Sequence, residues 1–311
     1  ANTTASNETA VGYNAMTANT TGNANTGIGA YALDANTTAG NNTALGVLAL
    51  TAATTGGDNT GIGKNALAGN TTGIQNVAVG SGALQTNTTT SELTAVGHEA
   101  ANAADGALGI CAIGYKAATD TTGNYTTAVG YQALFTNTTG ANNTALGWSA
   151  LRLSTDSANN TGLGYNALAV NTTGASNVAV GSTALDSNTE GSRNVAVGFA
   201  AGDAITTGSD NTAIGNWTLK TATTVGANTA LGTYALKMTT GANNTSVGKS
   251  SLETNSSGAG NTAIGYYAMY ANTTGASSVA VGYQALDANT TGGSSVAVGA
   301  SALSAQTTAG G

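Results

Sequence analysis

The sequence predicts an all-β fold: a single parallel β-solenoid domain of about 18 turns that covers residues 1–311. Three observations predict it. A glycine recurs every 17 residues, with two steps of 16. A short β-rich pattern, Asn-Thr-Ala-Leu-Gly in its form at 143–147, leads into each of these glycines. The period continues through the chain, which indicates that each unit is one turn stacked on the next.

The repeated glycine sets the period. A glycine required in every turn marks either a positive φ or a place where a neighbouring backbone comes too close for a Cβ. We therefore predict a structural glycine ladder, in which substitution harms the fold more than it does in a side-chain column. Its members include Gly12, Gly29, Gly46, Gly147, Gly164 and Gly282.

Two aliphatic columns accompany the glycine. The residue before it is Val, Ile or Leu, as at Val11, and the residue four positions after it is usually Leu, as at Leu33. The segment before the glycine alternates like a strand, so we expect its Thr or Val and its aliphatic residue to face the interior. The Ala-Leu segment after the glycine predicts a second short strand, and Asn-Thr-Thr-Gly predicts a corner. At Gly202 the leucine is missing, and Phe199 is expected to compensate.

An asparagine column runs through the repeats, for example at Asn25, Asn42 and Asn59. Stacked asparagine side chains can form hydrogen bonds from turn to turn, so we predict an asparagine ladder. The Asn-Thr-Thr triplets also match the N-glycosylation pattern, but ladder and turn roles already explain them.

Residues 91–120 are the least regular part of the chain. Leu93 and Ile110 replace the asparagine, while Ala101 and Ala118 replace the leucine. Bulk lost at one position is regained at the other, which predicts that the two positions are neighbours in the interior. A flat strand would place the asparagine opposite the aliphatic residue, so this interpretation requires a bend.

Composition excludes several classes of function. The chain has only seven Lys and Arg and a net charge of -7, without the basic stripe that nucleic-acid binding needs. No apolar run approaches the roughly 20 residues that cross a bilayer, so we predict no membrane insertion. A single cysteine excludes an intrachain disulfide framework. Since the sequence begins and stops inside a repeat, we expect either a segment of a longer fibre or a subunit whose ends are covered by partners.

Candidate chemistry is sparse. His98 and Glu99 are adjacent and Cys111 lies about one turn further on, but one histidine and one cysteine are too few for a zinc site or a catalytic triad. The acidic side chains share a predicted outward column with lysines and an arginine, which favours solvent exposure. The sequence therefore predicts no catalytic residue, no metal, no cofactor and no enzymatic activity.

The position after the glycine carries many aromatic residues. Aromatic side chains spaced along a polar surface can pack against neighbouring subunits or against sugar rings, and subunit packing is the favoured interpretation. These candidate surface or subunit contacts are Tyr13, Tyr115, Tyr131, Trp148, Tyr165, Phe199, Tyr266 and Tyr283.

Units such as 143–147 (Asn-Thr-Ala-Leu-Gly) and 278–282 (Ser-Val-Ala-Val-Gly) resemble the head repeats of trimeric autotransporter (YadA-like) adhesins. The longer pattern, with Asn-Thr-Thr-Gly at the corner, is similar to repeats of phage and cyanophage tail-fibre proteins. The resemblance covers essentially the whole chain. It implies a left-handed parallel β-roll, three chains side by side, and a rigid fibre. The adhesin repeats have a shorter period than this chain.

We accordingly expect a structural or adhesive fibre segment of the phage tail-fibre or bacterial adhesin type, located outside the cell or on a virion surface. It would act as a rigid spacer that contacts a surface, with a cell-surface glycan or receptor as candidate partner. The expected assembly is a homo-oligomer, with a trimer favoured over an end-to-end filament. The alternatives are a self-assembling extracellular filament subunit and an ice-binding protein.

Overall fold

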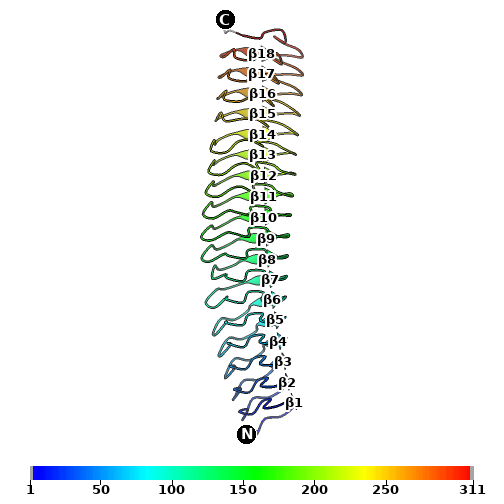
Figure 1. Cartoon of the computed structure of the whole chain (residues 1–311), viewed down its shortest axis with the longest axis vertical. Helices are drawn as coiled ribbons and strands as arrows, with labels where there is room; N and C mark the ends of the chain where they lie inside the picture. Colours follow the sequence, from blue (N-terminus) through cyan, green and yellow to red (C-terminus); the bar gives the residue numbers. More distant parts are fainter. Residues whose placement is uncertain (1–2, 309–311) are drawn as a thin grey trace. The chain divides into compact units, whose positions relative to one another are not determined.

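The computed structural model describes residues 3–308, and its contacts divide the chain into two units, Ala1–Asp156 and Ser157–Gly311. Each unit is a parallel β-solenoid with nine described strands, one per turn (Figure 1). The described residues contain no helix, and hence no helix that could span a membrane. The predicted all-β parallel solenoid with a repeat of about 17 residues is therefore confirmed.

Every strand has three residues. In unit 1 the strands are β1 (Thr9–Val11), β2 (Thr26–Ile28), β3 (Thr43–Leu45), β4 (Thr60–Ile62), β5 (Val77–Val79), β6 (Thr94–Val96), β7 (Cys111–Ile113), β8 (Thr127–Val129) and β9 (Thr144–Leu146). In unit 2 they are β10 (Thr161–Leu163), β11 (Val178–Val180), β12 (Val195–Val197), β13 (Thr212–Ile214), β14 (Thr229–Leu231), β15 (Thr245–Val247), β16 (Thr262–Ile264), β17 (Val279–Val281) and β18 (Val296–Val298).

The strands pair in parallel with identical positions in register. In β2 and β3, for example, Thr26 lies beside Thr43 and Ile28 beside Leu45. The shorter steps leave this register intact, because Cys111 of β7 still pairs with Thr127 of β8. The missing residue of a 16-residue turn therefore comes from outside the strand.

The inward face of the strands is the opposite of the predicted one. In β3 the central Ala44 is fully buried, while Leu45 is 44% exposed. The central residue is buried in β2 to β18, and the aliphatic residue before the glycine is buried in none of the described strands. The interior is too narrow for a second aliphatic column: a Cβ on Gly61, at the central position of β4, would already lie 3.3 Å from the Leu50 side chain. Small central residues are required there, so the large ones face outward.

The leucine column lies in the interior, as predicted, but the backbone that carries it does not have the predicted strand conformation. Leu33, Leu50 and Leu151 are fully buried. The Ala-Leu segment is a turn instead of a second strand, and both Leu48 and Leu50 have a positive φ, of 60° and 50°. A left-handed conformation costs an ordinary residue about 1–2 kcal/mol. Burying a leucine returns about 1.5–3 kcal/mol, so the turn that aims this side chain inward is tolerated.

The asparagine ladder is confirmed, although most of its contacts join a side chain to backbone. The backbone N–H of Asn59 donates to Oδ1 of Asn42, at 2.9 Å, and Nδ2 of Asn42 donates to the carbonyl of Gly56, at 3.0 Å. Both side chains are fully buried. Each side-chain amide accepts from one buried backbone N–H and donates to one buried backbone carbonyl. The ladder therefore satisfies backbone groups that the strand pairing leaves without a hydrogen-bond partner.

A second asparagine ladder lies at the corner. Nδ2 of Asn36 donates to the carbonyl of Ala39 at 3.1 Å and to Oδ1 of Asn19 at 3.2 Å. The threonine that follows is also engaged, since the hydroxyl of Thr37 donates to the carbonyl of Thr54. The Asn-Thr-Thr-Gly corner is thus built by hydrogen bonds within and between turns, as turn chemistry predicts.

The irregular turns confirm that the asparagine and leucine positions share the interior. Leu93, Ile110, Ala101 and Ala118 are all buried. The bend that the sequence seemed to require is unnecessary, because the asparagine position already lies on the inward side of the turn.

The gap at Gly202 is filled differently from the prediction. A Cβ there would lie 2.9 Å from Cδ1 of Ile205, which is fully buried, whereas Phe199 is exposed. Ile205 stands where most turns have the corner asparagine. Its buried side chain occupies the interior space that the leucine fills in other turns. Phe199 lies on the surface and does not compensate.

Both features offered above as reasons for the repeated glycine, a positive φ and a close neighbouring backbone, are present in the structure. All six members named above have φ between +133° and +144°. A Cβ on Gly46 would lie 2.5 Å from the carbonyl oxygen of Gly63 in the next turn. The repeated glycine therefore combines a backbone conformation closed to other residues with a contact between backbones.

Candidate functional site

The first candidate surface is the outward side of the strands, here called the strand face. It consists of the first and third residues of each strand, which are Thr, Val or Cys at the first position and Val, Ile or Leu at the third. None of the strands within residues 3–308 contains a charged residue. Within unit 1, Leu45, Ile113 and Leu146 are exposed, and Leu163 and Leu231 are exposed in unit 2. Each unit thus presents an uncharged apolar stripe to solvent.

The second candidate surface is the aromatic column at the position after the repeated glycine. All eight predicted contact residues of this column are exposed. Their rings stack on one another: the ring centres of Tyr115 and Tyr131 are 5.1 Å apart and those of Tyr131 and Trp148 are 5.6 Å apart, with nearly parallel planes. In unit 2, Tyr266 and Tyr283 stack at 5.6 Å. Because these rings are one turn apart, each ring packs against the ring of the next turn.

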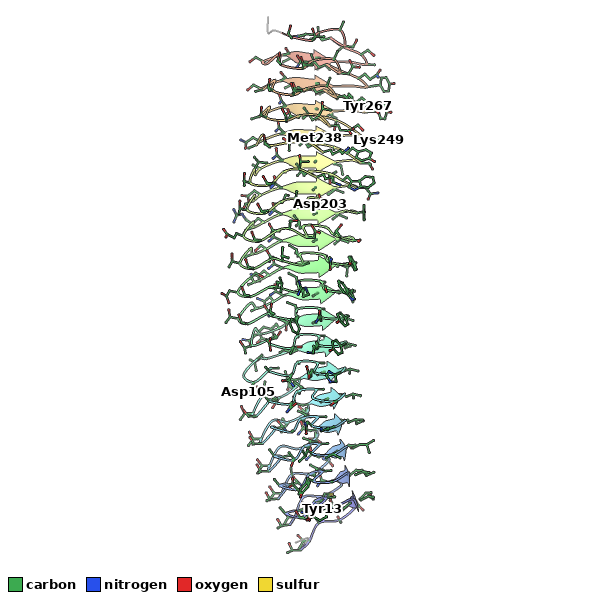
Figure 2. The ribbon with its side chains drawn as sticks, in the orientation of Figure 1. Tyr13, Asp105, Asp203, Met238, Lys249 and Tyr267 are labelled. Carbon is green, nitrogen blue, oxygen red and sulfur yellow. The ribbon has the colours of Figure 1, made fainter. Side chains whose placement is uncertain are left out.

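Not every predicted aromatic contact belongs to a parallel stack. Tyr13 meets Tyr31 edge to face at 5.4 Å, and Phe199 meets Trp217 edge to face at 5.5 Å. Their ring partners stand two positions after the glycine, outside the predicted aromatic column. That second position carries Tyr31, Trp217, Tyr234 and Tyr267, a signal present in the sequence. Figure 2 labels Tyr267, which projects beyond the arrowheads of the neighbouring strands in unit 2.

The residues weighed for metal or nucleophilic chemistry have surface roles. The His98 ring stacks on Tyr115 at 5.4 Å, and Glu99 forms an ion pair with Lys116 at 3.1 Å. The hydrogen bond that the Lys116 ammonium donates to the Glu99 carboxylate raises the pKa of Lys116 above its usual value. Cys111 is half-buried at the first position of β7. Between residues 3 and 308, no three His, Cys, Asp or Glu side chains lie close enough to hold a metal ion together.

The outward charged column is more enclosed than the sequence suggests. Asp186 and Asp203 are half-buried, and burial is the largest cause that raises the pKa of each carboxyl above its usual value. At Asp203 the Lys220 ammonium opposes this rise, while the Asp186 carboxylate adds to it. The column therefore combines charge with partial desolvation, in contrast to the uncharged strand face.

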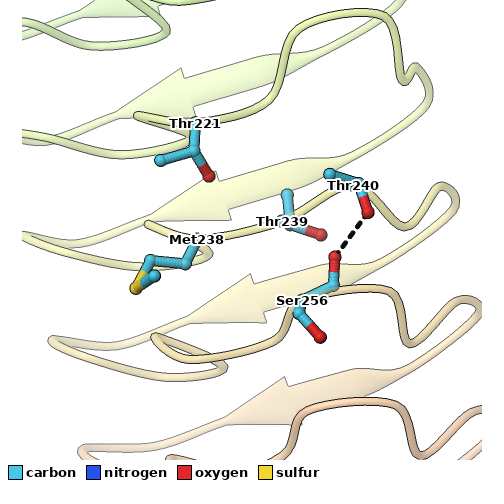
Figure 3. Close-up of a pocket in the computed structure, with 5 residues that line it drawn as sticks. All are labelled: Thr221, Met238, Thr239, Thr240 and Ser256. Atoms are coloured by element: carbon cyan, nitrogen blue, oxygen red, sulfur yellow. Dashed lines mark hydrogen bonds between the residues drawn. The ribbon is translucent and has the colours of Figure 1, made fainter.

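A hollow of about 260 Å³ lies at the shortened corner of unit 2 (Figure 3). Its lining residues are Thr221, Met238, Thr239, Thr240 and Ser256. Thr239 takes the corner asparagine position and accepts a hydrogen bond from Nδ2 of Asn255, at 3.2 Å. The omitted residue is thus one of the two corner threonines. The hollow contains hydroxyls and a thioether without a titratable group, so it offers no acid or base for catalysis.

A comparison of the sequence with models of known protein families finds no matching family, and a comparison with curated proteins finds no match.

Proposed function

We propose that this chain is a structural fibre segment, outside a cell or on a virion, whose copies associate through the strand face. The observation that carries the proposal is the outward apolar stripe: aliphatic residues that are exposed or half-buried in every described strand, on strands that contain no charge. Soluble monomers rarely expose contiguous apolar patches beyond a few hundred Å² unless the patch binds something.

The size of the strand face fits association. Nine strands spaced about 4.8 Å apart, with two outward columns roughly 7–10 Å across, give an area on the order of 400 Å² per unit. Each unit by itself therefore offers about half of the roughly 800 Å² per partner that a standard interface buries. Packing two such faces would bury aliphatic side chains and threonine methyl groups without desolvating a charge.

A second copy of the chain is the partner that this chemistry fits best. A partner must be uncharged and apolar along its length. Its side chains must also repeat at the spacing between turns. Another strand face meets each condition, since its strands repeat at the same spacing. We propose a homo-oligomer with the strand faces turned inward, and a trimer is the stoichiometry that the resemblance implies.

The alternatives receive less support. The corner threonines are poorly suited to ice binding, because the first threonine of the corner is used within the fold: Thr20 donates to the carbonyl of Thr37, and Thr54 to that of Thr71. End-to-end filament growth would not require an apolar strand face. The strand-face variant described next distinguishes an oligomer formed through the strand face from a filament formed end to end.

The test changes the strand face without touching the interior. In a triple variant, Leu45→Lys, Ile113→Lys and Leu146→Lys place ammonium groups on exposed positions of unit 1. We expect the wild-type chain to form a discrete oligomer and this variant to be monomeric at micromolar concentration, because charges cannot be buried in an apolar interface. Native mass spectrometry and light scattering measure the difference.

A matched control carries three lysines on an exposed corner: Thr21→Lys, Thr55→Lys and Thr72→Lys. It should assemble like the wild type, and circular dichroism should be unchanged in both variants. A monomeric wild type, or a strand-face variant that still assembles, would contradict the proposal. Long filaments of varied length in the strand-face variant would favour end-to-end growth instead.

A further inference from the structure

Unit 2 has a corner where aromatic rings and ammonium groups lie together. The rings of Trp217 and Tyr234 are one turn apart, with centres at 5.3 Å and planes 6° from parallel. Lys220 Nζ lies 5.8 Å from the centre of the Trp217 ring, and Lys237 Nζ lies 4.8 Å from that of Tyr234. These four half-buried side chains line a shallow hollow of about 240 Å³.

Lysines outnumber acids in the segment around this hollow, although the Asp203 carboxylate lies near enough to Lys220 to interact with it electrostatically. The sequence has fourteen acidic and seven basic residues, yet residues 211–286 contain three lysines and only one acid, Glu253. Lys237 pairs with Glu253, with Nζ and Oε1 3.5 Å apart. Within the described part of the chain, no carboxylate lies within ion-pair distance of Lys220. The hollow thus has an ammonium group available for an anion.

The aromatic surface restricts the kind of anion. A small inorganic anion would use the lysines and make no contact with the rings. The rings offer a flat apolar surface, whereas each ammonium donates up to three hydrogen bonds. A ligand that uses both needs an apolar face, hydroxyl groups and a negative charge. A sugar ring with a carboxylate or sulfate has all three.

We propose that Trp217, Tyr234, Lys220 and Lys237 bind an acidic sugar unit of a polysaccharide. The C–H face of the sugar packs on the two aromatic rings, Lys220 binds its carboxylate or sulfate, and Lys237 donates to its hydroxyls while it stays paired with Glu253. This site lies outside the strand face and does not depend on association of the chain.

Isothermal titration calorimetry of the intact chain tests the ligand class. The probes are tetragalacturonic acid, which carries carboxylates, a sulfated heparin tetrasaccharide and the neutral maltotetraose. We expect at least one acidic probe to bind about tenfold or more tightly than maltotetraose, and the stronger one identifies the preferred anionic group. If neither acidic probe binds, or if maltotetraose binds as tightly, the proposal is wrong.

Two substitutions test the residues. Lys220→Gln and Trp217→Asn introduce side chains that other turns carry at the same positions, Gln85 and Asn65, so the fold should tolerate both. Each should weaken binding of the acidic probe by about tenfold or more, since a charged hydrogen bond or the ring surface is lost.

The control is Lys64→Ser, which removes one exposed lysine of unit 1 and introduces the residue found one turn later at Ser81. It should bind the acidic probe like the wild type, and circular dichroism should match for all variants. Equal weakening in Lys64→Ser would show nonspecific attraction and overturn the assignment, as would unchanged binding in both site variants.

Discussion

A Gly46→Ala variant is expected to lose about 4 kcal/mol of the free energy of unfolding, a loss at the severe end for a single substitution. Two costs combine. The φ of Gly46 is +144°, which an alanine rarely adopts, and the new Cβ would lie 2.5 Å from the carbonyl oxygen of Gly63. That oxygen belongs to backbone, so it cannot move aside like a side chain. Gly63 is itself in close contact with Gly80, so a shift of one turn disturbs the next.

Urea unfolding followed by circular dichroism measures this loss. Gly106→Ala is the matched control, because Gly106 also has a positive φ, of +82°, but a Cβ there would meet nothing within 4 Å. We expect it to lose only about 1–2 kcal/mol, the cost of the left-handed backbone alone. Equal losses in the two variants would mean that the contact between turns contributes nothing.

Asn42→Asp is expected to cost about 3–5 kcal/mol at neutral pH, the range for a buried charge without a partner. The side chain keeps its shape but loses the donor that Asn42 gives to the carbonyl of Gly56. A carboxylate oxygen would then face that carbonyl oxygen inside the solenoid. The N–H of Asn59 can still donate to the other oxygen, so only half of the original pairing survives.

The loss in Asn42→Asp should depend on pH. Burial and the facing carbonyl raise the pKa of the new carboxyl in the folded state above its value in the unfolded chain. The folded state therefore binds more protons, and the destabilisation should shrink as the pH falls from neutral through the raised pKa. A protonated carboxyl can donate to Gly56 again.

Asn14→Asp is the control for this pH dependence, since Asn14 is exposed. It should change stability by only a few tenths of a kcal/mol at any pH. Urea midpoints measured from neutral to mildly acidic pH give the comparison. A destabilisation of Asn42→Asp that stays constant over this range would contradict the assigned role of the amide hydrogens.

Much of the fold could be predicted because its period is visible in the residues. The spacing of the glycines located every turn, and the leucines at positions such as Leu50 identified the interior. The exchange of bulk between Leu93 and Ala101 correctly placed the asparagine position in the core. That same exchange contained the clue to the inward face of the strand. Side chains alternate along a strand, so an interior asparagine puts the alanine two positions later inside and the aliphatic residue next to that alanine outside.

The candidate surfaces could be predicted only in part. The aromatic column after the glycine is visible in the sequence, and its eight residues are exposed as expected. The pairing of Trp217 with Tyr234 was missed because aromatic residues are rare at that position. Proximity of Lys220 and Lys237 to these rings depends on the left-handed turn, which the leucine pattern alone does not reveal.

The sequence by itself determined the repeat, the stacking of turns and the need for glycine, because a period of 17 residues repeats each contact in every turn. Only the tertiary structure decided which side of each strand faces inward. Alternation defines two faces but does not say which one is enclosed. The width of the interior decides that, since leucine and asparagine columns leave room beside them for alanine or glycine, and the valines, isoleucines and leucines before the glycines are left on the outside.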